Sequence, residues 1–391
     1  MLLLAESRED VWVTFFTGSM YPKLMEEMAR IPQGRLKRVQ NRVNVIDVAS
    51  NAKGMFDAPE FENAIQQLFD GSGKITCLTS KKIYTSLPKP NLVIVDPVAG
   101  YAIEAIRKIA APEKLPIWSW MTSSVGATVA LWGPKHLGGR GDDWKEVNIL
   151  KTEEERSART VELLSHLDDK IISIPGYPPM HHYEYQPQEQ KIPVSLSGAA
   201  VRIGYKYLYE TDGYISVTTS ILEEDATKAW KEYFHSLGKD FYEIGFIAAT
   251  MNTAKEDDVP AVSGFLLEMQ QTRGEKSVVY VSTAPYFPKP VLMLEQISFG
   301  SAWWPGNPDM LYAVIDELIE SKTPFLIANP SPFPSSALPE GAVKRIDEYP
   351  FGHATKWAPQ EAVLEHPAVG WFISHAGWNG LQESVSSKVP A

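Results

Sequence analysis

Two short segments near the end of the chain carry residue types that could bind a nucleotide. They are Trp357-Ala-Pro-Gln360 and His375-Ala-Gly-Trp-Asn-Gly-Leu-Gln-Glu383. The second segment follows an apolar run, Gly370–Ser374, which predicts a buried strand, and it opens a predicted helix that extends to Ser387. Backbone N–H groups and the positive end of the helix dipole converge at such a turn, so we expect a phosphate to bind there.

The side chains around this turn fit the rest of a nucleotide. Asn379 and Glu383 are four residues apart and share one helix face, where the carboxylate could hold a ribose diol. Trp357 ends a predicted strand and offers a flat surface for a base, a contact worth about 1–3 kcal/mol. Singly, Trp357 is also typical of a core residue, His375 of a turn cap and Glu383 of a solvated helix. Their combined spacing favours a nucleotide diphosphate site.

The scaffold for these segments follows from short apolar runs that alternate with helical patterns, which predicts parallel sheets with crossover helices. The predicted strands of the first half are Val11–Phe16, Val43–Val48, Leu92–Val95, Ile117–Met121, Tyr214–Val217 and Phe241–Phe246. Those of the second half are Ser277–Ser282, Phe325–Ala328, Ala354–Trp357 and Gly370–Ser374. Predicted helices include Tyr21–Arg30, Pro59–Phe69, Tyr101–Ala110 and Asp309–Glu320. The fold class is therefore α/β with two Rossmann-like, doubly wound domains.

The domain boundaries follow from changes in composition. We expect residues 1–250 to form the first domain, the polar residues 251–276 to be the interdomain linker, and residues 277–391 to form the second domain. The second domain is expected to be incomplete, because no strand follows its last strand-to-helix unit. A Pro-rich stretch within residues 283–297 interrupts it, and this is either an ordinary loop or translated sequence that does not belong in the mature protein.

Composition restricts the classes of function. A chain of 391 residues that is 44% hydrophobic and 22% charged is typical of a globular protein. Its net charge of −11 argues against nucleic acid and anionic membranes as partners. The single cysteine, Cys77, excludes an internal disulfide framework and a multi-cysteine metal site. No run is typical of a signal peptide or of a transmembrane segment of ~20 residues, so we expect a cytoplasmic protein.

The end of the chain resembles the signature box of UDP-dependent glycosyltransferases. The resemblance is carried by Trp357-Ala-Pro-Gln360, Leu364-Glu-His366, Gly370-Trp-Phe372, His375-Ala-Gly-Trp-Asn379, Glu383-Ser384 and Val389-Pro390. In that family two Rossmann-like domains face each other across a cleft, the GT-B arrangement, with no cofactor and no catalytic metal. The resemblance implies inverting transfer of a sugar from a UDP-sugar to a hydroxyl of a small, lipophilic acceptor.

The resemblance also implies roles for individual residues. Trp357 would stack on uracil and the Ala358 backbone would bond to its edge, while Gln360 and Glu383 would hold the ribose. The residues expected at or beside the diphosphate are Ser301, His375, Gly377, Trp378 and Asn379. The family usually has Ser or Thr where this chain has Gly380, and the missing hydroxyl contact is worth about 0.5–1.5 kcal/mol.

The resemblance implies a catalytic pair of which only one member is found. In the family a His near the first strand removes the acceptor proton and an Asp orients that His. Asp96 matches the Asp, because it follows a predicted strand and ligands bind at the carboxyl ends of strands; the alternative is a turn carboxylate before Pro97. All eight histidines lie at or after His136, so we expect the first strand of the first domain and its His-bearing loop to be missing, and the chain to stop before the residues that read the sugar. We therefore expect this chain alone to be weakly active or inactive.

Two other classes of function share parts of this pattern. A non-catalytic remnant that binds a uridine nucleotide or a partner is the main alternative. A nicotinamide-dependent oxidoreductase would share the architecture, but no Gly-x-Gly-x-x-Gly turn follows an early strand. The segment Tyr177–Tyr185 is interpreted as a loop near the acceptor or, equally, as a Pro-rich surface loop.

Overall fold

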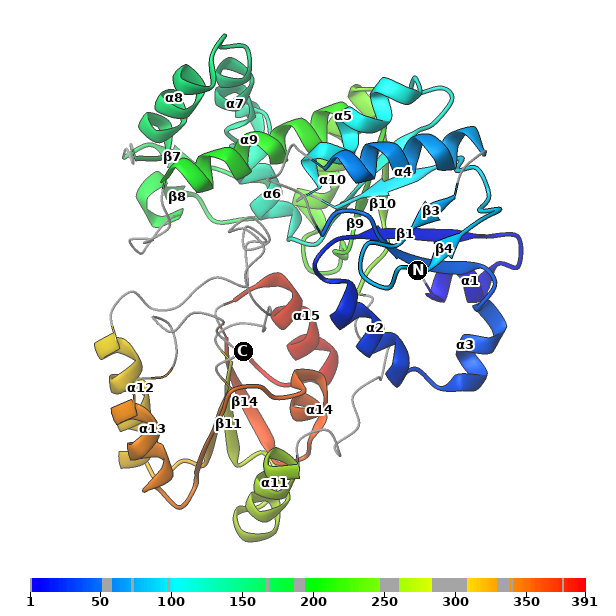
Figure 1. Cartoon of the computed structure of the whole chain (residues 1–391). Coiled ribbons are helices and arrows are strands. Elements are labelled where there is room, and N and C mark those ends of the chain that lie inside the picture. Colours follow the sequence, from blue (N-terminus) through cyan, green and yellow to red (C-terminus); the bar gives the residue numbers. More distant parts are fainter. Residues whose placement is uncertain are drawn as a thin grey trace.

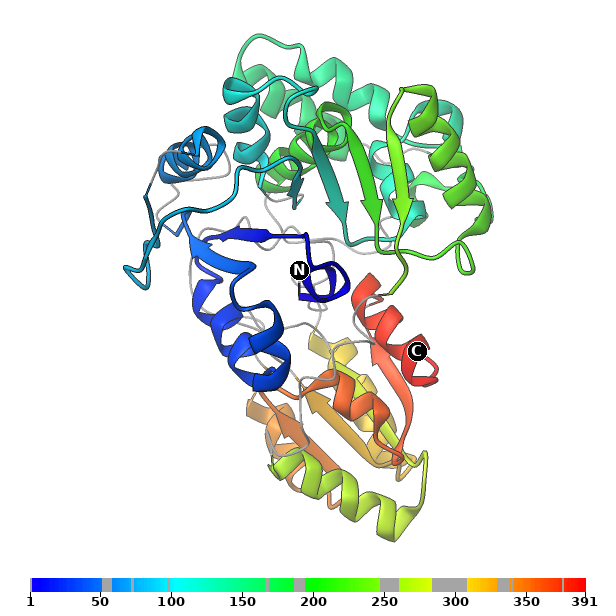
Figure 2. The same ribbon diagram turned by 90° about the vertical axis from the view of Figure 1, so that its right-hand side faces the viewer.

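A computed structural model shows two α/β lobes, formed by the first and last parts of the chain (Figures 1 and 2). The structure describes residues 2–50, 58–71, 74–96, 99–165, 169–185, 194–246, 260–282, 308–328, 338, 340–374 and 376–391. In Figure 1 the first lobe, coloured blue to green, lies above the second, coloured yellow-green to red. None of the helices in these ranges combines the length and apolar character that are needed to cross a bilayer.

The first lobe contains two parallel sheets. The larger has the strand order β10-β9-β6-β5, and β1 pairs with β2 in the smaller. The strands are β1 (Val13–Thr17), β2 (Val43–Asp47), β5 (Val93–Val95), β6 (Ile117–Met121), β9 (Gly213–Ser216) and β10 (Asp240–Glu243). All six predicted strands are present. Among the described residues they form two separate sheets. The edge strand β5 of the larger sheet pairs with neither strand of the smaller sheet.

Short antiparallel pairs and ten α-helices complete the described part of the first lobe. The pairs are β3 (Ile75–Thr76) with β4 (Ile83–Tyr84), and β7 (Ile171–Ile172) with β8 (Met180–His181). The helices are α1 (Leu2–Ser7), α2 (Tyr21–Arg30), α3 (Gln33–Val39), α4 (Pro59–Asp70), α5 (Gly100–Ile109), α6 (Val125–Trp132), α7 (Gly141–Asn148), α8 (Glu153–Ser165), α9 (Val194–Glu210) and α10 (Glu224–Ser236). Two 3₁₀ turns cover Lys135–Leu137 and His182–Tyr185.

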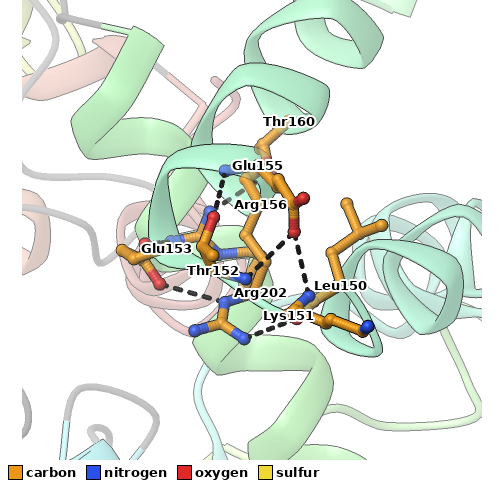
Figure 3. Close-up of polar contacts among 8 residues, drawn as sticks. All are labelled: Leu150, Lys151, Thr152, Glu153, Glu155, Arg156, Thr160 and Arg202. Atoms are coloured by element: carbon orange, nitrogen blue, oxygen red, sulfur yellow. Dashed lines mark hydrogen bonds and ion pairs between the residues drawn. The ribbon is translucent and has the colours of Figure 1, made fainter.

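Helices α7 and α8 project from the first lobe, beside the start of α9 (Figure 1). Helix α8 begins with a capping box, in which Thr152 Oγ1 accepts from Glu155 N at 3.1 Å and the Glu155 carboxylate accepts from Thr152 N at 3.0 Å (Figure 3). The buried Arg202 guanidinium of α9 donates to Glu153 and to Thr160, both on α8. This polar cluster fixes α8 against α9.

The second lobe is one parallel sheet in the order β13-β12-β11-β14. Its strands are β11 (Val278–Ser282), β12 (Phe325–Ala328), β13 (Gly352–Thr355) and β14 (Val369–Ser374), and its helices are α11 (Pro260–Arg273), α12 (Pro308–Glu320), α13 (Glu340–Asp347), α14 (Gln360–Glu365) and α15 (Trp378–Ser387). Alternation along β12 divides the core: Phe325 and Ile327 pack with α12 and α13, whereas Leu326 and Ala328 pack with α11 and α14.

Helix α11 corrects the predicted linker. It lies inside residues 251–276, and its Val262, Leu266 and Met269 side chains are buried in the core of the second lobe. Spacings of four and three residues place these side chains on one helix face, which is the periodicity of a helix that packs on a sheet. The linker prediction is therefore wrong for residues 260–273, and residues 247–259 lie outside the described ranges.

The two lobes touch through α15. The Gln382 side chain, which is 4% exposed, donates from Nε2 to the Val217 carbonyl oxygen at 3.0 Å. The ring of Trp378 meets that of Phe246 edge-on at 6.4 Å. Both figures show α15 on the side of the second lobe that faces the first. The residue that follows β9 is therefore in contact with the helix that follows β14.

Candidate functional site

The turn between β14 and α15 has a backbone suited to an anion. Ala376 has a φ of 57°, in the left-handed region that is uncommon for a residue other than glycine, and its N–H donates to Ser374 Oγ at 3.2 Å. Gly377 is the N-cap of α15 and has no side chain with which to accept from the first turn. The first N–H groups of α15 therefore have no acceptor from an N-cap side chain, which leaves them available to a phosphate.

Gln360 and Glu383 meet beside this turn. Gln360 begins α14 and Glu383 lies on α15, and Gln360 Nε2 donates to Glu383 Oε2. Burial raises the pKa of Glu383 above the usual value for a glutamate, and the hydrogen bond from Gln360 partly offsets this rise. The structure thus brings together the two side chains that were expected to hold a ribose.

Trp357 and Ala358 follow β13 and cross toward α14. Thr355 Oγ1 donates to the Trp357 carbonyl oxygen at 2.9 Å, which fixes the backbone just after the strand. Ala358 is buried in the core shared with α11, whereas the Trp357 side chain is only half-buried. Trp357 is therefore anchored by its backbone, and the residue is not fully enclosed.

The other predicted site residues of α15 differ in their surroundings. Asn379 is exposed, Trp378 is half-buried, and the indole N–H of Trp378 has no hydrogen-bond partner among the described residues. Gly380 is buried, but a Cβ at this position would lie 3.4 Å from Ser374 Oγ and 3.7 Å from Gln360 Nε2, which are ordinary contacts. A small side chain therefore fits at residue 380.

Asp96 lies at the carboxyl end of β5 and is exposed. Strand β5 is separated from β9 by β6 alone, so at a strand spacing of about 4.8 Å the two strands lie about 10 Å apart. Because parallel strands end at the same edge, Asp96 shares the edge of the sheet that contacts α15. The residue before it is fixed by the buried Tyr207 hydroxyl, which lies 2.7 Å from the Val95 carbonyl oxygen.

Glu223 is a buried carboxylate at the same edge of the first lobe that is not among the predicted site residues. It is 6% exposed, and its carboxylate accepts from Val125 N at 3.0 Å, Gly126 N at 2.8 Å, the Tyr177 hydroxyl at 2.6 Å and the Thr218 hydroxyl. The carboxylate occupies the N-terminus of α6, where an external anion would otherwise bind. Glu223 therefore joins the ends of β6 and β9 to the loop that carries Tyr177.

Close packing fixes the same loop. A Cβ at Gly126 would lie 2.4 Å from Cε2 of the Tyr177 ring, so only glycine allows this ring to approach α6. Further along the segment, the His181 ring stacks on Tyr183 at 5.1 Å, and its Nδ1 lies 3.0 Å from the Asp169 carbonyl oxygen. One end of the segment Tyr177–Tyr185 is therefore fixed at the sheet edge of the first lobe.

Some predicted positions lie outside the described ranges. These are Ser301, His375 and the interrupted stretch of residues 283–297. Within the described ranges, no group of three or more His, Cys, Asp or Glu side chains is placed to hold a metal ion.

Comparison with known proteins shows which proteins this chain resembles. A model described as UDP-glucoronosyl and UDP-glucosyl transferase matches residues 351–391, which contain β13, α14, β14 and α15. The UDP-glycosyltransferase eriJ of Hericium erinaceus is 32% identical to this chain over 235 residues. The end of the chain therefore matches the UDP-glycosyltransferase family. The match with eriJ covers 58% of this chain and 43% of eriJ, so the chain spans less than half of that relative.

A further relative and two solved structures are also similar to this chain. Anthocyanidin 3-O-galactosyltransferase F3GT1 of Actinidia chinensis var. chinensis is 42% identical over 96 residues, which are 24% of this chain and 20% of that protein. A ugt transferase from Siraitia grosvenorii, solved with UDP, has a TM-score of 0.65 at 20% identity and covers 99% of this chain and 76% of its own. Medicago truncatula UGT71G1, solved with UDP-glucose, has a TM-score of 0.60 at 18% identity, with coverages of 99% and 74%. The fold is the α/β GT-B arrangement.

Proposed function

We propose that this chain binds a UDP-sugar at the turn after β14, and that the protein transfers the sugar, with inversion, to a hydroxyl of a small lipophilic acceptor. The observation that carries the proposal is the Gln360–Glu383 pair beside the start of α15, which has no N-cap side chain. A half-buried carboxylate with one amide partner can accept from the two hydroxyls of a ribose. The adjacent N–H groups suit the diphosphate that is linked to that ribose.

The donor would lie along the carboxyl edge of the second sheet. Uracil would stack on the half-buried Trp357 ring, with the Ala358 backbone at its edge, and the diphosphate would lie at Asn379 and Gly377. When the bond between the sugar and UDP breaks, negative charge develops on the diphosphate. The dipole of α15 and its first N–H groups would stabilise that charge.

The acceptor would approach from the first lobe. Its hydroxyl must lose a proton as the new bond forms, and Asp96, at the edge of the first sheet that contacts α15, would orient the base. His136, His181 and His353 face the rings of aromatic side chains, and none of these ring contacts involves Asp96. We assign no base in this chain and expect it to transfer sugar weakly or not at all when it is assayed alone.

Isothermal titration of the purified chain with UDP tests the donor site. We expect saturable binding, and we expect Glu383→Ala to weaken it about 10- to 100-fold, because hydrogen bonds to a charged group contribute about 1.5–3 kcal/mol. Glu365→Ala on the exposed side of α14 is the matched control and should bind like the wild type. A folded wild-type chain that does not bind UDP would overturn the proposal.

A uridine-nucleotide-binding protein without transfer activity is supported by the same pair of residues. Incubation with a UDP-sugar and a panel of phenolic acceptors separates the two functions. Binding of UDP without any glycoside product, even when imidazole is added as an external base, would favour the binding function. Product above a boiled control would favour the transferase.

A further inference from the structure

We propose that Tyr280 is a positioning residue for the donor site: it fixes the amide of Gln360 and thereby sets the preference of the site for ribose over 2′-deoxyribose. This inference rests on the proposed binding of a uridine nucleotide. Neither the family resemblance nor the predicted site residues include Tyr280. It lies on β11, two residues before the carboxyl end of that strand, and its hydroxyl contacts Gln360.

Tyr280 is held rigidly. It is 1% exposed, and its ring stacks on Phe372 of the neighbouring strand β14 at 5.2 Å with an interplanar angle of 11°. Its hydroxyl donates to Gln360 Oε1 at 3.4 Å. Because β11 lies between β12 and β14, the phenol is enclosed by packed neighbours in the middle of the sheet.

The contacts of Gln360 select one orientation of its amide. A glutamine amide has one acceptor, the oxygen, and one donor group, the NH₂. Tyr280 lies against the oxygen, and Glu383 lies against the nitrogen. Burial raises the pKa of Tyr280 well above its usual value, so the hydroxyl stays protonated and keeps its role as donor. A flipped amide would lose the bond from Tyr280 and would turn its oxygen toward the Glu383 carboxylate.

The orientation of the amide decides how Glu383 meets a ligand. With the NH₂ group against one carboxylate oxygen, Glu383 is held in one position and its other lone pairs are left for hydroxyl donors. A ribose offers a 2′-hydroxyl and a 3′-hydroxyl, whereas 2′-deoxyribose offers only the latter. If the amide can rotate, the carboxylate loses its fixed position, and the second hydroxyl contributes less to binding.

The test measures dissociation constants for UDP and 2′-deoxy-UDP with the wild-type chain and with Tyr280→Phe. We expect the wild type to prefer UDP about tenfold or more, since a charge-assisted hydrogen bond is at stake. Tyr280→Phe keeps the ring stacked on Phe372 and should reduce UDP affinity about three- to tenfold with 2′-deoxy-UDP affinity unchanged. The ratio of the two affinities is the readout that a purely structural role would not change.

Tyr349→Phe is the matched control. Tyr349 lies in the same lobe, its ring stacks on Phe325 at 5.7 Å, and its hydroxyl donates to the Thr323 carbonyl oxygen, also at 3.4 Å. This variant should leave the UDP preference at the wild-type value. The inference would be overturned if Tyr280→Phe left the ratio of the two affinities unchanged, for example by weakening both nucleotides equally. A wild type that binds both nucleotides with equal affinity would also overturn it. A wild type that binds neither nucleotide would instead overturn the proposed function itself.

Discussion

Glu223 and Glu383 are two carboxylates at the carboxyl edges of two parallel sheets, and their surroundings differ sharply. Glu223, in the first lobe, accepts hydrogen bonds from four donors that come from three separate segments. Glu383, in the second lobe, has one hydrogen-bond partner in the part of the chain that the structure describes, the amide of Gln360. One carboxylate is saturated by the protein, and the other keeps lone pairs that no described residue uses.

The difference separates a structural role from a binding role. Most buried polar groups in proteins are hydrogen-bonded, so a half-buried carboxylate with few protein donors is a candidate for a functional site. Glu223 stabilises the first lobe by closing the N-terminus of α6 with a charge of the protein's own. Glu383 is partly desolvated without an equal gain in hydrogen bonds, and a ligand with hydroxyl groups could supply what is missing.

The largest expected effect comes from removing the saturated carboxylate. Glu223→Ala leaves two buried backbone N–H groups and two hydroxyls without their acceptor, and we expect the free energy of unfolding to fall by about 3–4 kcal/mol. Urea denaturation followed by tryptophan fluorescence measures this loss. Glu224→Ala, one residue further on and exposed, should stay within about 0.5 kcal/mol of the wild type. A Glu223→Ala chain as stable as Glu224→Ala would remove the distinction between the two carboxylates.

The next largest effect is the pH dependence of UDP binding, which should depend on Glu383. Its pKa is raised by burial, so in the free protein it takes up a proton at a higher pH than an ordinary glutamate. Ribose hydroxyls donate to the carboxylate form, so UDP affinity should fall as the pH drops through this raised pKa. The free energy of unfolding of the free protein should change in the opposite direction. The contribution of Glu383 to this free energy is lost as the pH rises through the raised pKa, because burial favours the protonated form.

Titration calorimetry with UDP at a series of pH values, on the wild type and on Glu383→Gln, isolates this effect. The phosphate of UDP titrates equally in both experiments, so the ratio of the two dissociation constants reports the carboxylate. A ratio that does not change across the acidic range would show that Glu383 does not meet the ribose.

The smallest effect is expected from a substitution that adds a hydrogen-bonding group to the proposed donor site. Gly380→Ser places a hydroxyl among Ser374, Gln360 and the expected diphosphate, and the available space accommodates its Cβ. We expect UDP to bind about two- to tenfold more tightly, which corresponds to about 0.5–1.5 kcal/mol for one hydrogen bond. Gly380→Ala supplies the Cβ and the gain in helix propensity without the hydroxyl. If the two variants bind UDP equally, the hydroxyl does not reach the nucleotide.

The sequence predicted local structure well, because strand and helix patterns are local. All ten predicted strands form, and Tyr21–Arg30 is a helix with the predicted bounds. Helix α11 was missed because the polar residues before it dominated the interpretation, although Val262, Leu266 and Met269 have helical spacing. The division of the first lobe into two sheets was also missed, since pairing between distant strands leaves no local pattern.

The candidate site shows the same limit. Trp357, Gln360 and Glu383 were predicted through their resemblance to a known signature, and the contact between the last two is present. Neither Glu223 nor Tyr280 is among the predicted site residues, because the contacts of each depend on partners that are distant in the sequence. Glu223 lies 97 residues from Gly126, and Tyr280 lies 80 residues from Gln360. No spacing rule connects residues so far apart.

The hydrogen bond from Gln382 to Val217 has a consequence for how two substrates would influence each other. Gln382 is bonded to the first lobe, and the next residue, Glu383, is bonded to Gln360 at the proposed ribose site. A nucleotide that steadies α15 must then also steady the backbone after β9, next to the expected acceptor side. Thermodynamic reciprocity requires that any tightening of acceptor binding by UDP be matched by an equal tightening of UDP binding by the acceptor.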